Sequence, residues 1–402
     1  MAQSIYQKIV FNLLNSMKLG KLHLSFENKS YEFGEGDEIT ANIQINHKEF
    51  FKQIVLHGDI GFGESYMEKH WETADLAGVI SWMILNIDSL PGMSGSASRF
   101  NPINLLRYSD RLIQLLQPNS LKGSKRNIAR HYDLSNEFFK RFLDSTMTYS
   151  SALFLGENDP LEKAQKQKYD SLCQSIKLSK NDHILEIGCG WGGFAVHSAK
   201  HYGCKVTGIT ISEEQYKYAV ERIKREKLDD KVEILFKDYR LVDGKYDKVV
   251  SIEMIEAVGH KYFRKYFEKI NDLLKPAGVL GLQAIIIADK RYEEYRKGAD
   301  WIRKHIFPGG LLPSIRKINE SINQVSNLNL YSLKEMGFSY AKTLRCWYEN
   351  FNSDLPAITK LGFDESFLRK WEYYLCSCQA SFEQRNINVV QMVYARPNHP
   401  YF

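Results

Sequence analysis

The sequence predicts an α/β fold in which a mostly parallel sheet carries helices on both faces, with a smaller α+β domain before it. Three observations lead to this prediction. Short apolar runs alternate with runs of helical period from about residue 182 onward, as they do in parallel sheets. A glycine-rich turn follows the first of these apolar runs. The first hundred residues instead have the pattern of short alternating strands.

The N-terminal domain, with its linker, is predicted to span residues 1–110. Residues 21–26 (KLHLSF) and 38–45 (EITANIQI) alternate apolar and polar side chains as strands do, with a turn between them. Helical patterns follow at residues 49–72, which contain a glycine-rich bend, and at residues 75–87. The stretch 90–102 is rich in Gly, Ser and Pro, which is typical of a linker. The domain boundary is therefore predicted between residues 90 and 115.

The second domain is predicted to span residues 111–402. Its expected strands are residues 183–188, 204–211, 231–238, 246–255 and 279–287, and its expected helices are residues 194–203, 213–227 and 261–278. Gly203 ends the first of these helices, and Pro276 with Gly278 ends the third. Ligands of such sheets bind beyond the carboxyl ends of the strands.

Composition and charge exclude several classes of protein. The chain has 402 residues, 44% of them hydrophobic and 25% charged, which is typical of a globular protein. No apolar run reaches the roughly 18 residues of a spanning helix, and no secretion signal is recognised at the N-terminus. The six cysteines lack the spacing of a disulfide framework or a zinc site, so we expect reduced thiols and no metal. The net charge of +6 mildly favours anionic partners.

The glycine-rich turn LEIGCGWGGFA (residues 185–195) indicates a ligand that approaches the backbone closely. A phosphate-binding P-loop would need GKS or GKT, which is absent. Gly188, Gly190 and Gly193 do match the GxGxxG of dinucleotide-binding folds. The second strand, however, ends in TGITIS without the acid that binds the ribose. A tight strand-to-helix turn without a ligand remains the structural alternative.

An acidic residue, Glu186, lies instead within the first strand. It is preceded by apolar residues and followed by GCGxG, and this pattern resembles the first motif of class I S-adenosylmethionine-dependent methyltransferases. Five further strings occur in the order found in the cyclopropane-fatty-acyl-phospholipid synthases, which the chain resembles over nearly its whole length. They are residues 131–154, 208–215, 253–259, 306–314 and 345–351. Residues 283–302 and 370–378 resemble the branch that includes the plant enzymes. The resemblance implies a Rossmann-like class I methyltransferase sheet with helical lid insertions.

The resemblance also implies which residues bind S-adenosylmethionine. Residues at the TYSS turn would cover the methionine part, and the glycines would approach it from below. Residues that follow the second and third strands of the sheet would contact the ribose and adenine. The cofactor-binding residues implied in this way are Tyr149, Ser150, Glu186, Gly188, Gly190, Thr210, Gln215, Asp238 and Tyr239.

For catalysis, the resemblance implies methyl transfer to the cis double bond of a phospholipid acyl chain, through a carbocation that loses a proton to a bound bicarbonate. The residues implied to hold this ion are Ser151, Glu256, Gln283, Ile285 and Tyr348. Gln283 stands where the best-known bacterial enzymes have a histidine, so the predicted cradle lacks one positive charge. We therefore expect weaker bicarbonate binding than in a histidine-bearing enzyme.

The expected partner is a membrane phospholipid, bound by a cytoplasmic protein at the periphery of the inner membrane face. Residues 300–314 are expected to form an acyl-chain lid, with basic side chains that meet headgroups, and a homodimer is compatible with the resemblance. A nucleic-acid substrate is not expected, because no D/N-P-P-Y/F motif and no basic cluster with interleaved aromatic residues is present. Small-molecule or lipid C-methylation without ring closure, and cofactor binding without catalysis, remain the alternatives.

Overall fold

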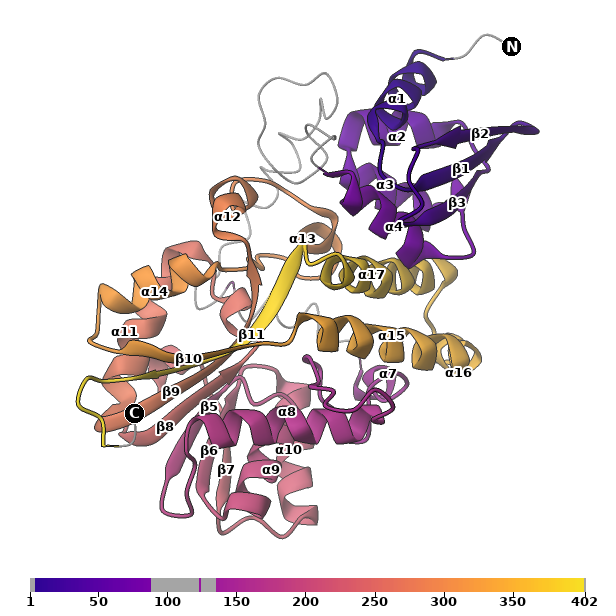
Figure 1. Cartoon of the computed structure of the whole chain (residues 1–402). Coiled ribbons are helices and arrows are strands. Elements are labelled where there is room, and N and C mark those ends of the chain that lie inside the picture. Colours follow the sequence, from indigo (N-terminus) through magenta and orange to yellow (C-terminus); the bar gives the residue numbers. More distant parts are fainter. Residues whose placement is uncertain (1–3, 88–122, 124–134, 401–402) are drawn as a thin grey trace. The chain divides into compact units, whose positions relative to one another are not determined.

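The computed structural model describes residues 4–87, 123 and 135–400 (Figure 1). The chain separates into two compact units. Unit 1 comprises residues 1–117, 290–308 and 355–386, and unit 2 comprises residues 118–289, 309–354 and 387–402. The single division predicted near residue 110 is thus replaced by an interleaved one, in which two later segments fold with the N-terminal part. The predicted linker at 90–102 lies outside the described residues.

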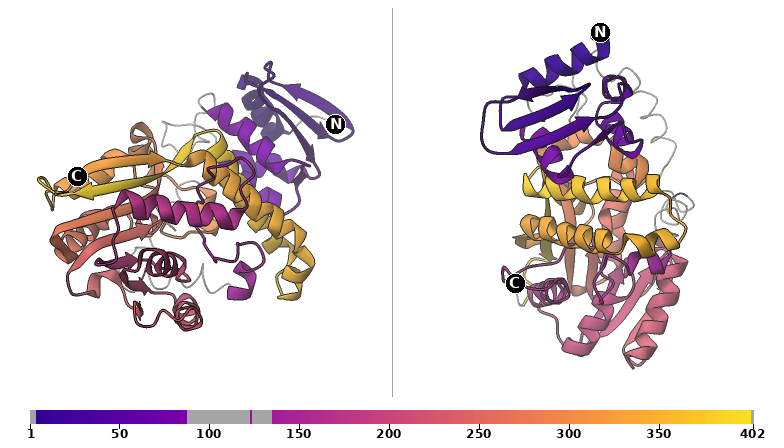
Figure 2. Two further views of the ribbon diagram at one scale, coloured as in Figure 1. Left: turned by 60° about the horizontal axis from the view of Figure 1, so that its bottom comes forward. Right: turned by 90° about the vertical axis from the view of Figure 1, so that its right-hand side faces the viewer.

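Unit 1 is built on a four-stranded sheet in the order β2-β1-β3-β4, seen from two further sides in Figure 2. The strands are β1 (Lys21–Phe26), β2 (Lys29–Phe33), β3 (Thr40–Ile45) and β4 (Trp71–Glu72). β1 pairs in parallel with β3, and the other two pairings are antiparallel. β2 was not predicted. It follows a two-residue hairpin turn at Glu27 and Asn28, whose φ angles of 49° and 59° match the turn that two-residue hairpins prefer.

The helices of unit 1 come from both ends of the chain. They are α1 (Ile5–Ser16), α2 (Glu49–His57), α3 (Asp59–Met67), α4 (Leu76–Leu85), α12 (Asp289–Tyr295), α13 (Trp301–His305), α16 (Leu355–Lys360) and α17 (Glu365–Glu383). α17 packs on α3 and α4. A Cβ atom added to Gly63 would lie 2.5 Å from Trp301 and 2.8 Å from Tyr373. Close packing of aromatic side chains against α3 explains why the later segments belong to this unit.

Unit 2 contains a seven-stranded sheet in the order β10-β11-β9-β8-β5-β6-β7. The strands are β5 (His183–Ile187), β6 (Lys205–Thr210), β7 (Val232–Phe236), β8 (Tyr246–Ile252), β9 (Leu274–Ile287), β10 (Asn329–Glu335) and β11 (Ile387–Ala395). Five strands that are neighbours in the sheet, β9, β8, β5, β6 and β7, are parallel to one another. β11 is antiparallel to both of its neighbours. The predicted parallel sheet is confirmed.

Helices cover both faces of this sheet, as predicted. The helices are α7 (Asn136–Phe139), α8 (Leu161–Ser175), α9 (Gly193–Tyr202), α10 (Glu213–Arg225), α11 (Phe263–Leu273), α14 (Ile315–Asn323) and α15 (Gly337–Ser353). The chain winds outward from β5 in both directions. Right-handed crossovers therefore place α9 and α10 on one face and α11 on the other. α8 packs on α9, and α11 packs on α14.

α11 is shorter than the sequence predicted. It ends at Leu273 rather than near Gly278, and β9 begins at Leu274. The residue before a proline is pushed away from helical backbone angles, so Pro276 already makes Lys275 extended, and the chain joins the sheet earlier. No helix among the described residues is long and apolar enough to cross a bilayer.

Candidate active site

The glycine turn joins β5 to α9 at the carboxyl end of the sheet. Gly188, Gly190 and Gly192 have φ angles of 82°, 53° and 79°, which favour glycine. The backbone amides of Gly188 and Cys189 donate to the carbonyl of Ile209 at 3.0 and 2.9 Å, which fixes the turn to β6. A Cβ atom on Gly190 would meet no atom within 4 Å. The turn therefore presents bare backbone to open space, as a cofactor requires.

Glu186 lies at the end of β5 beside this turn and is buried. Burial raises the pKa of its carboxyl to about 8, although the charges of Lys168 and Arg222 and the Ala195 amide act in the opposite direction. Its Oε2 atom is buried and has no hydrogen-bond partner among the described residues. This oxygen fits as an acceptor for the ammonium group of S-adenosylmethionine, whose positive charge would favour the ionised form of Glu186. The residues of the turn therefore fit the predicted cofactor.

The residues predicted for the ribose and adenine lie at the ends of the next two strands. The hydroxyl of Thr210 donates to Oε1 of Gln215 at 2.8 Å, so these two side chains form one polar pair. Asp238 accepts two hydrogen bonds from the guanidinium of Arg240, at 2.8 and 2.7 Å. Tyr239 packs edge-on against Tyr266, with ring centres 5.2 Å apart.

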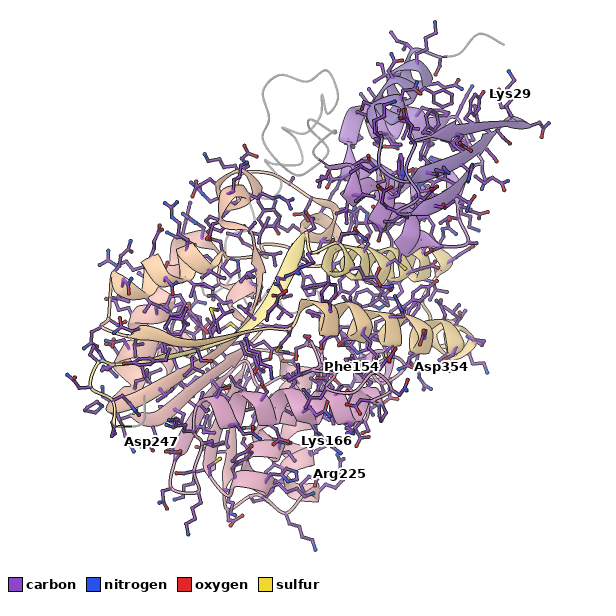
Figure 3. The ribbon with its side chains drawn as sticks, in the orientation of Figure 1. Lys29, Phe154, Lys166, Arg225, Asp247 and Asp354 are labelled. Carbon is purple, nitrogen blue, oxygen red and sulfur yellow. The ribbon has the colours of Figure 1, made fainter. Side chains whose placement is uncertain are left out.

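The TYSS turn lies between α7 and α8. Tyr149 packs against Phe139 and Trp347, with ring centres 5.4 and 5.3 Å apart. The hydroxyl of Ser150 accepts from Nζ of Lys168 at 2.7 Å. Figure 3 shows Phe154, which follows this turn, between α8 and α15, and Asp247 at the other end of the sheet. Of the other predicted residues, the glycine turn, Thr210 and Asp238 lie at the carboxyl ends of β5, β6 and β7.

The centre of the site is a carboxylate that the sequence analysis did not predict. Glu253 follows β8 with a left-handed φ of 49°. Its Oε1 accepts from the backbone amide of Ser151 at 2.8 Å and from Nε2 of Gln283 at 2.7 Å. Its Oε2 accepts from the hydroxyl of Tyr340 at 2.8 Å. Burial raises the pKa of Glu253, while the charge of Lys168 and these hydrogen bonds oppose the rise.

Glu256 lies one turn further along, in the 3-10 helix η3 (Ile255–Ala257). The backbone amide of Ile285 donates to its Oε1 at 2.5 Å, whereas its Oε2 is buried without a partner among the described residues. Burial and the neighbouring Glu253 raise the pKa of Glu256 to about 8. Glu256 is therefore largely neutral at pH 7, and Glu253, with three donors, is the better-stabilised anion.

Bicarbonate does not fit this arrangement of residues. The predicted donors Ser151 and Gln283 are both bound to Glu253, and the Ile285 amide is bound to Glu256. An added anion would compete with these side chains for the same donors and would be repelled by the charge of Glu253. The chain supplies a carboxylate where the resemblance implied a bound ion.

A second tyrosine contacts the centre. Tyr340 and Tyr348 both lie on α15, eight residues apart, which is about 12 Å along a helix. Tyr340 donates to Glu253, and the predicted contact of Tyr348 stays a prediction. Glu253, Tyr340 and Lys168 were missed. The EMIE string at 253–256, with two acids three residues apart, was the available signal for Glu253.

The predicted lid at 300–314 divides between the two units. Residues 301–305 form α13 in unit 1, where Lys304 and His305 both contact Oε1 of Glu64, at 2.8 and 2.9 Å. Arg303 is buried and donates to Asp300 at 2.6 Å. These basic side chains are paired inside unit 1, which argues against the expected headgroup contacts. In unit 2 the amide of Leu311 donates to the carbonyl of Glu256 at 2.8 Å.

Comparisons with known proteins find relatives over most of the chain. Residues 119–392 match the family model described as mycolic acid cyclopropane synthetase. The chain is 38% identical over 357 residues to the tuberculostearic acid methyltransferase UfaA1 of Mycobacterium tuberculosis, covering 87% of this chain and 82% of that protein. It is 36% identical over 356 residues to the cyclopropane-fatty-acyl-phospholipid synthase of Escherichia coli K12, covering 89% and 88%.

Solved structures show the same fold. The mycolic acid cyclopropane synthase CmaA1, complexed with SAH and CTAB, superimposes with a TM-score of 0.63 at 28% identity. The match covers 68% of this chain and 98% of that one. That structure was solved with SAH bound.

Proposed function

The chain belongs to the mycolic acid cyclopropane synthetase family of S-adenosylmethionine-dependent, lipid-modifying methyltransferases. From this premise we propose that it methylates the cis double bond of an unsaturated phospholipid acyl chain. We further propose that Glu253, in place of a bound bicarbonate, accepts the proton that is then lost. The observation that carries the proposal is the partly buried Glu253 carboxylate, held by three donors beside the glycine turn.

S-adenosylmethionine supplies an electrophilic methyl group: the π electrons of the alkene bond to it, the C–S bond breaks, and its electron pair leaves with sulfur. One former alkene carbon is then cationic. Aromatic faces stabilise cations, and Trp347 packs against both Tyr149 and Tyr340, with ring centres 5.3 and 6.1 Å apart. These three side chains form the aromatic wall that we propose for the cation.

Glu253 then takes a proton from the added methyl group. From the described residues, Oε1 accepts two hydrogen bonds, whereas Oε2 accepts one, from Tyr340. A carboxylate oxygen accepts two, so we propose that the proton transfers to the second lone pair of Oε2. The C–H electron pair closes the ring onto the cationic carbon. A proton lost from a chain carbon beside the cation would instead leave a methyl-branched alkene. A hydride shift that moves the cation to the methyl-bearing carbon, followed by loss of a methyl proton, would leave a methylene chain.

We extend the proposal to the location of the enzyme. A phospholipid substrate requires contact with a bilayer, and the described residues contain no spanning helix. The net charge of +6 favours an anionic surface. On this basis the protein is cytoplasmic and binds the inner face of the membrane peripherally.

The experiment tests whether the proton acceptor is a carboxylate of the protein or bicarbonate from the solvent. Purified protein is assayed with labelled S-adenosylmethionine and cis-unsaturated phospholipid vesicles, in degassed buffer with and without bicarbonate. Mass spectrometry resolves cyclopropane, methylene and methyl-branched chains. We expect the native enzyme to form cyclopropane chains at the same rate in both buffers. Activity that appears only on addition of bicarbonate would overturn the role of Glu253.

The variant Glu253→Gly sharpens this test. Its three donors lose their acceptor, and glycine accepts the left-handed φ of 49°. We expect it to be inactive in degassed buffer and to regain part of the activity with bicarbonate, but not with an equal concentration of chloride. An unchanged rate in degassed buffer would contradict the proposal.

A further inference from the structure

Lys168, in the middle of α8, is a buried cation that the proposed reaction does not use. Its exposed fraction is 0%. Its Nζ atom donates to the hydroxyl of Ser150 at 2.7 Å and lies 4.3 Å from the centre of the Tyr169 ring. Removing an ion from water costs roughly several kcal/mol. A lysine therefore persists at such a site only where other interactions compensate.

Hydrogen bonds connect Lys168 to Glu253 from two sides. On one side, Nζ holds Ser150, and the amide of the next residue, Ser151, binds Oε1 of Glu253. On the other side, Nε2 of Gln391 donates at 3.0 Å both to the carbonyl of Lys168 and to Oε1 of Gln283. Nε2 of Gln283 in turn donates to Glu253. The backbone and side chain of Lys168 thus support both donors to the same carboxylate oxygen.

The charges around this pair come from several elements. Glu253 after β8, Asp144 before the TYSS turn and Glu186 on β5 act on Lys168. Among described residues, the charged group that acts on Glu253 is the cation Lys168, and Glu253 in turn raises the pKa of Glu256 of η3, which is largely neutral at pH 7. The neutral Tyr340 of α15 also contacts Glu253, and Arg222 of α10 acts on Glu186. Lys168 therefore offsets the cost of holding the charge of Glu253 in this site.

We propose that Lys168 is a positioning residue of the methyl-transfer site, which keeps the Glu253 carboxylate ionised and holds the Ser150–Ser151 turn against it. This inference rests on the proposed role of Glu253 as proton acceptor. Burial lowers the pKa of Lys168 to about 8, against the opposing charges of Glu253, Asp144 and Glu186. Its charge is therefore present at pH 7 and declines above pH 8.

The test is the pH dependence of methyl transfer at saturating S-adenosylmethionine in Lys168→Met and Lys168→Arg. An opposite charge nearby lowers a carboxyl pKa by roughly 1–3 units, so its removal raises that pKa. In Lys168→Met we expect the acidic limb of the pH–rate profile to move to higher pH by about one pH unit. In Lys168→Arg the acidic limb should stay at the pH of the native enzyme, whatever the absolute rate. A merely structural role would lower the rate of Lys168→Met without moving the limb, and this result would overturn the inference.

Lys166→Met is the matched control. Lys166 lies on the same helix, half-exposed, with Nζ 2.5 Å from Glu162, and Figure 3 labels it on α8. Its profile should equal that of the native enzyme. If Lys168→Met is too unstable to assay, Lys168→Met/Glu253→Gln is compared with it. The double variant should unfold at a higher temperature, because the uncompensated anion is gone, and equal instability would overturn the inference.

Failure of this inference is distinguishable from failure of the proposed function. If Lys168 has no such role, Glu253→Gln still loses activity while Lys168→Met keeps the native acidic limb. If Glu253 is not the proton acceptor, Glu253→Gln itself keeps the native rate.

Discussion

Gln283 contacts Glu253 twice. Its side-chain Nε2 donates to Oε1 of Glu253 at 2.7 Å, and its carbonyl accepts from the Glu253 amide at 2.8 Å. Gln391, directly opposite Gln283 on β11, donates to the remaining amide oxygen at 3.0 Å. The orientation of the Gln283 amide is thereby fixed, with its NH₂ group toward Glu253. This orientation of the Gln283 amide suits an anionic Glu253.

Glu253→Gln should lower methyl transfer by roughly 10²–10⁴-fold, the usual contribution of a general base. The neutral amide cannot accept the proton as a carboxylate does, whereas the glycine turn is untouched. Single-turnover rates give the loss, and calorimetry should give an S-adenosylmethionine affinity equal to that of the native enzyme. A loss of less than about tenfold would exclude Glu253 from the proton path.

Glu256→Gln should have a much smaller effect below pH 8. The carboxyl of Glu256 is already largely neutral there, because burial and Glu253 raise its pKa to about 8. Glutamine also retains an oxygen that can accept from the Ile285 amide. Above pH 8 the native and variant rates should diverge, since only the native side chain ionises. A 10²-fold loss at pH 7, about that of a general base, would show instead that Glu256 is the proton acceptor.

Gly190→Arg should abolish S-adenosylmethionine binding without preventing folding. The space beside Gly190 is open, so the new side chain would occupy the place of the cofactor. Gly362→Arg is the control, because Gly362 also has a positive φ, of 95°, and open space beside it. Both variants should lose roughly 1–2 kcal/mol of stability to backbone strain. Calorimetry should find S-adenosylmethionine binding in Gly362→Arg alone, and binding in both would refute the cofactor site.

The stability of the whole chain should fall in acid because of Glu64. Burial would raise the pKa of this carboxyl, but the hydrogen bonds from His305 and Lys304 outweigh burial and hold it at about 2, below the ordinary 4.5. The group therefore stabilises the folded state above pH 4.5, and this contribution is lost as the pH falls toward 2. The difference in unfolding free energy between native protein and Glu64→Gln should shrink over that range. A constant difference in denaturant titrations would contradict the assignment.

Binding to phospholipid vesicles should weaken with salt, if the membrane contact that we propose is electrostatic. Exposed charges are screened over about 8 Å at physiological ionic strength. Co-sedimentation is measured with anionic and with neutral vesicles over a range of salt concentrations. We expect stronger binding to anionic vesicles at low salt and convergence of the two at high salt. Equal binding under all conditions would remove the electrostatic component.

The sheet and its glycine turn could be predicted because hydrophobic periodicity reports burial, and burial differs between strands and helices. The interleaving of the units could not, since it depends on contacts such as Trp301 against Gly63, far apart in the sequence. The positions of Ser151, Gln283 and Ile285 around one centre followed from the family resemblance, and their hydrogen bonds confirm that they lie together.

Glu253 was missed for a local reason. The apolar pattern extended the predicted strand to residue 255, whereas β8 ends at Ile252 and Glu253 turns into the left-handed region. Few residues other than glycine adopt that conformation, so no propensity indicates a glutamate there. Tyr340 was missed because helical spacing alone does not tell which tyrosine of α15 reaches the centre.

The hydrogen bonds of Glu253 offset the strain of its left-handed backbone. A non-glycine residue in a sparsely populated backbone region costs on the order of 1–3 kcal/mol. Glycine would relieve this cost, but it would leave the Ser151 amide, Gln283 and Tyr340 without their acceptor, at about 1–3 kcal/mol for each buried donor. In directed evolution of this chain, selection for thermal tolerance and selection for lipid modification should therefore both retain Glu253.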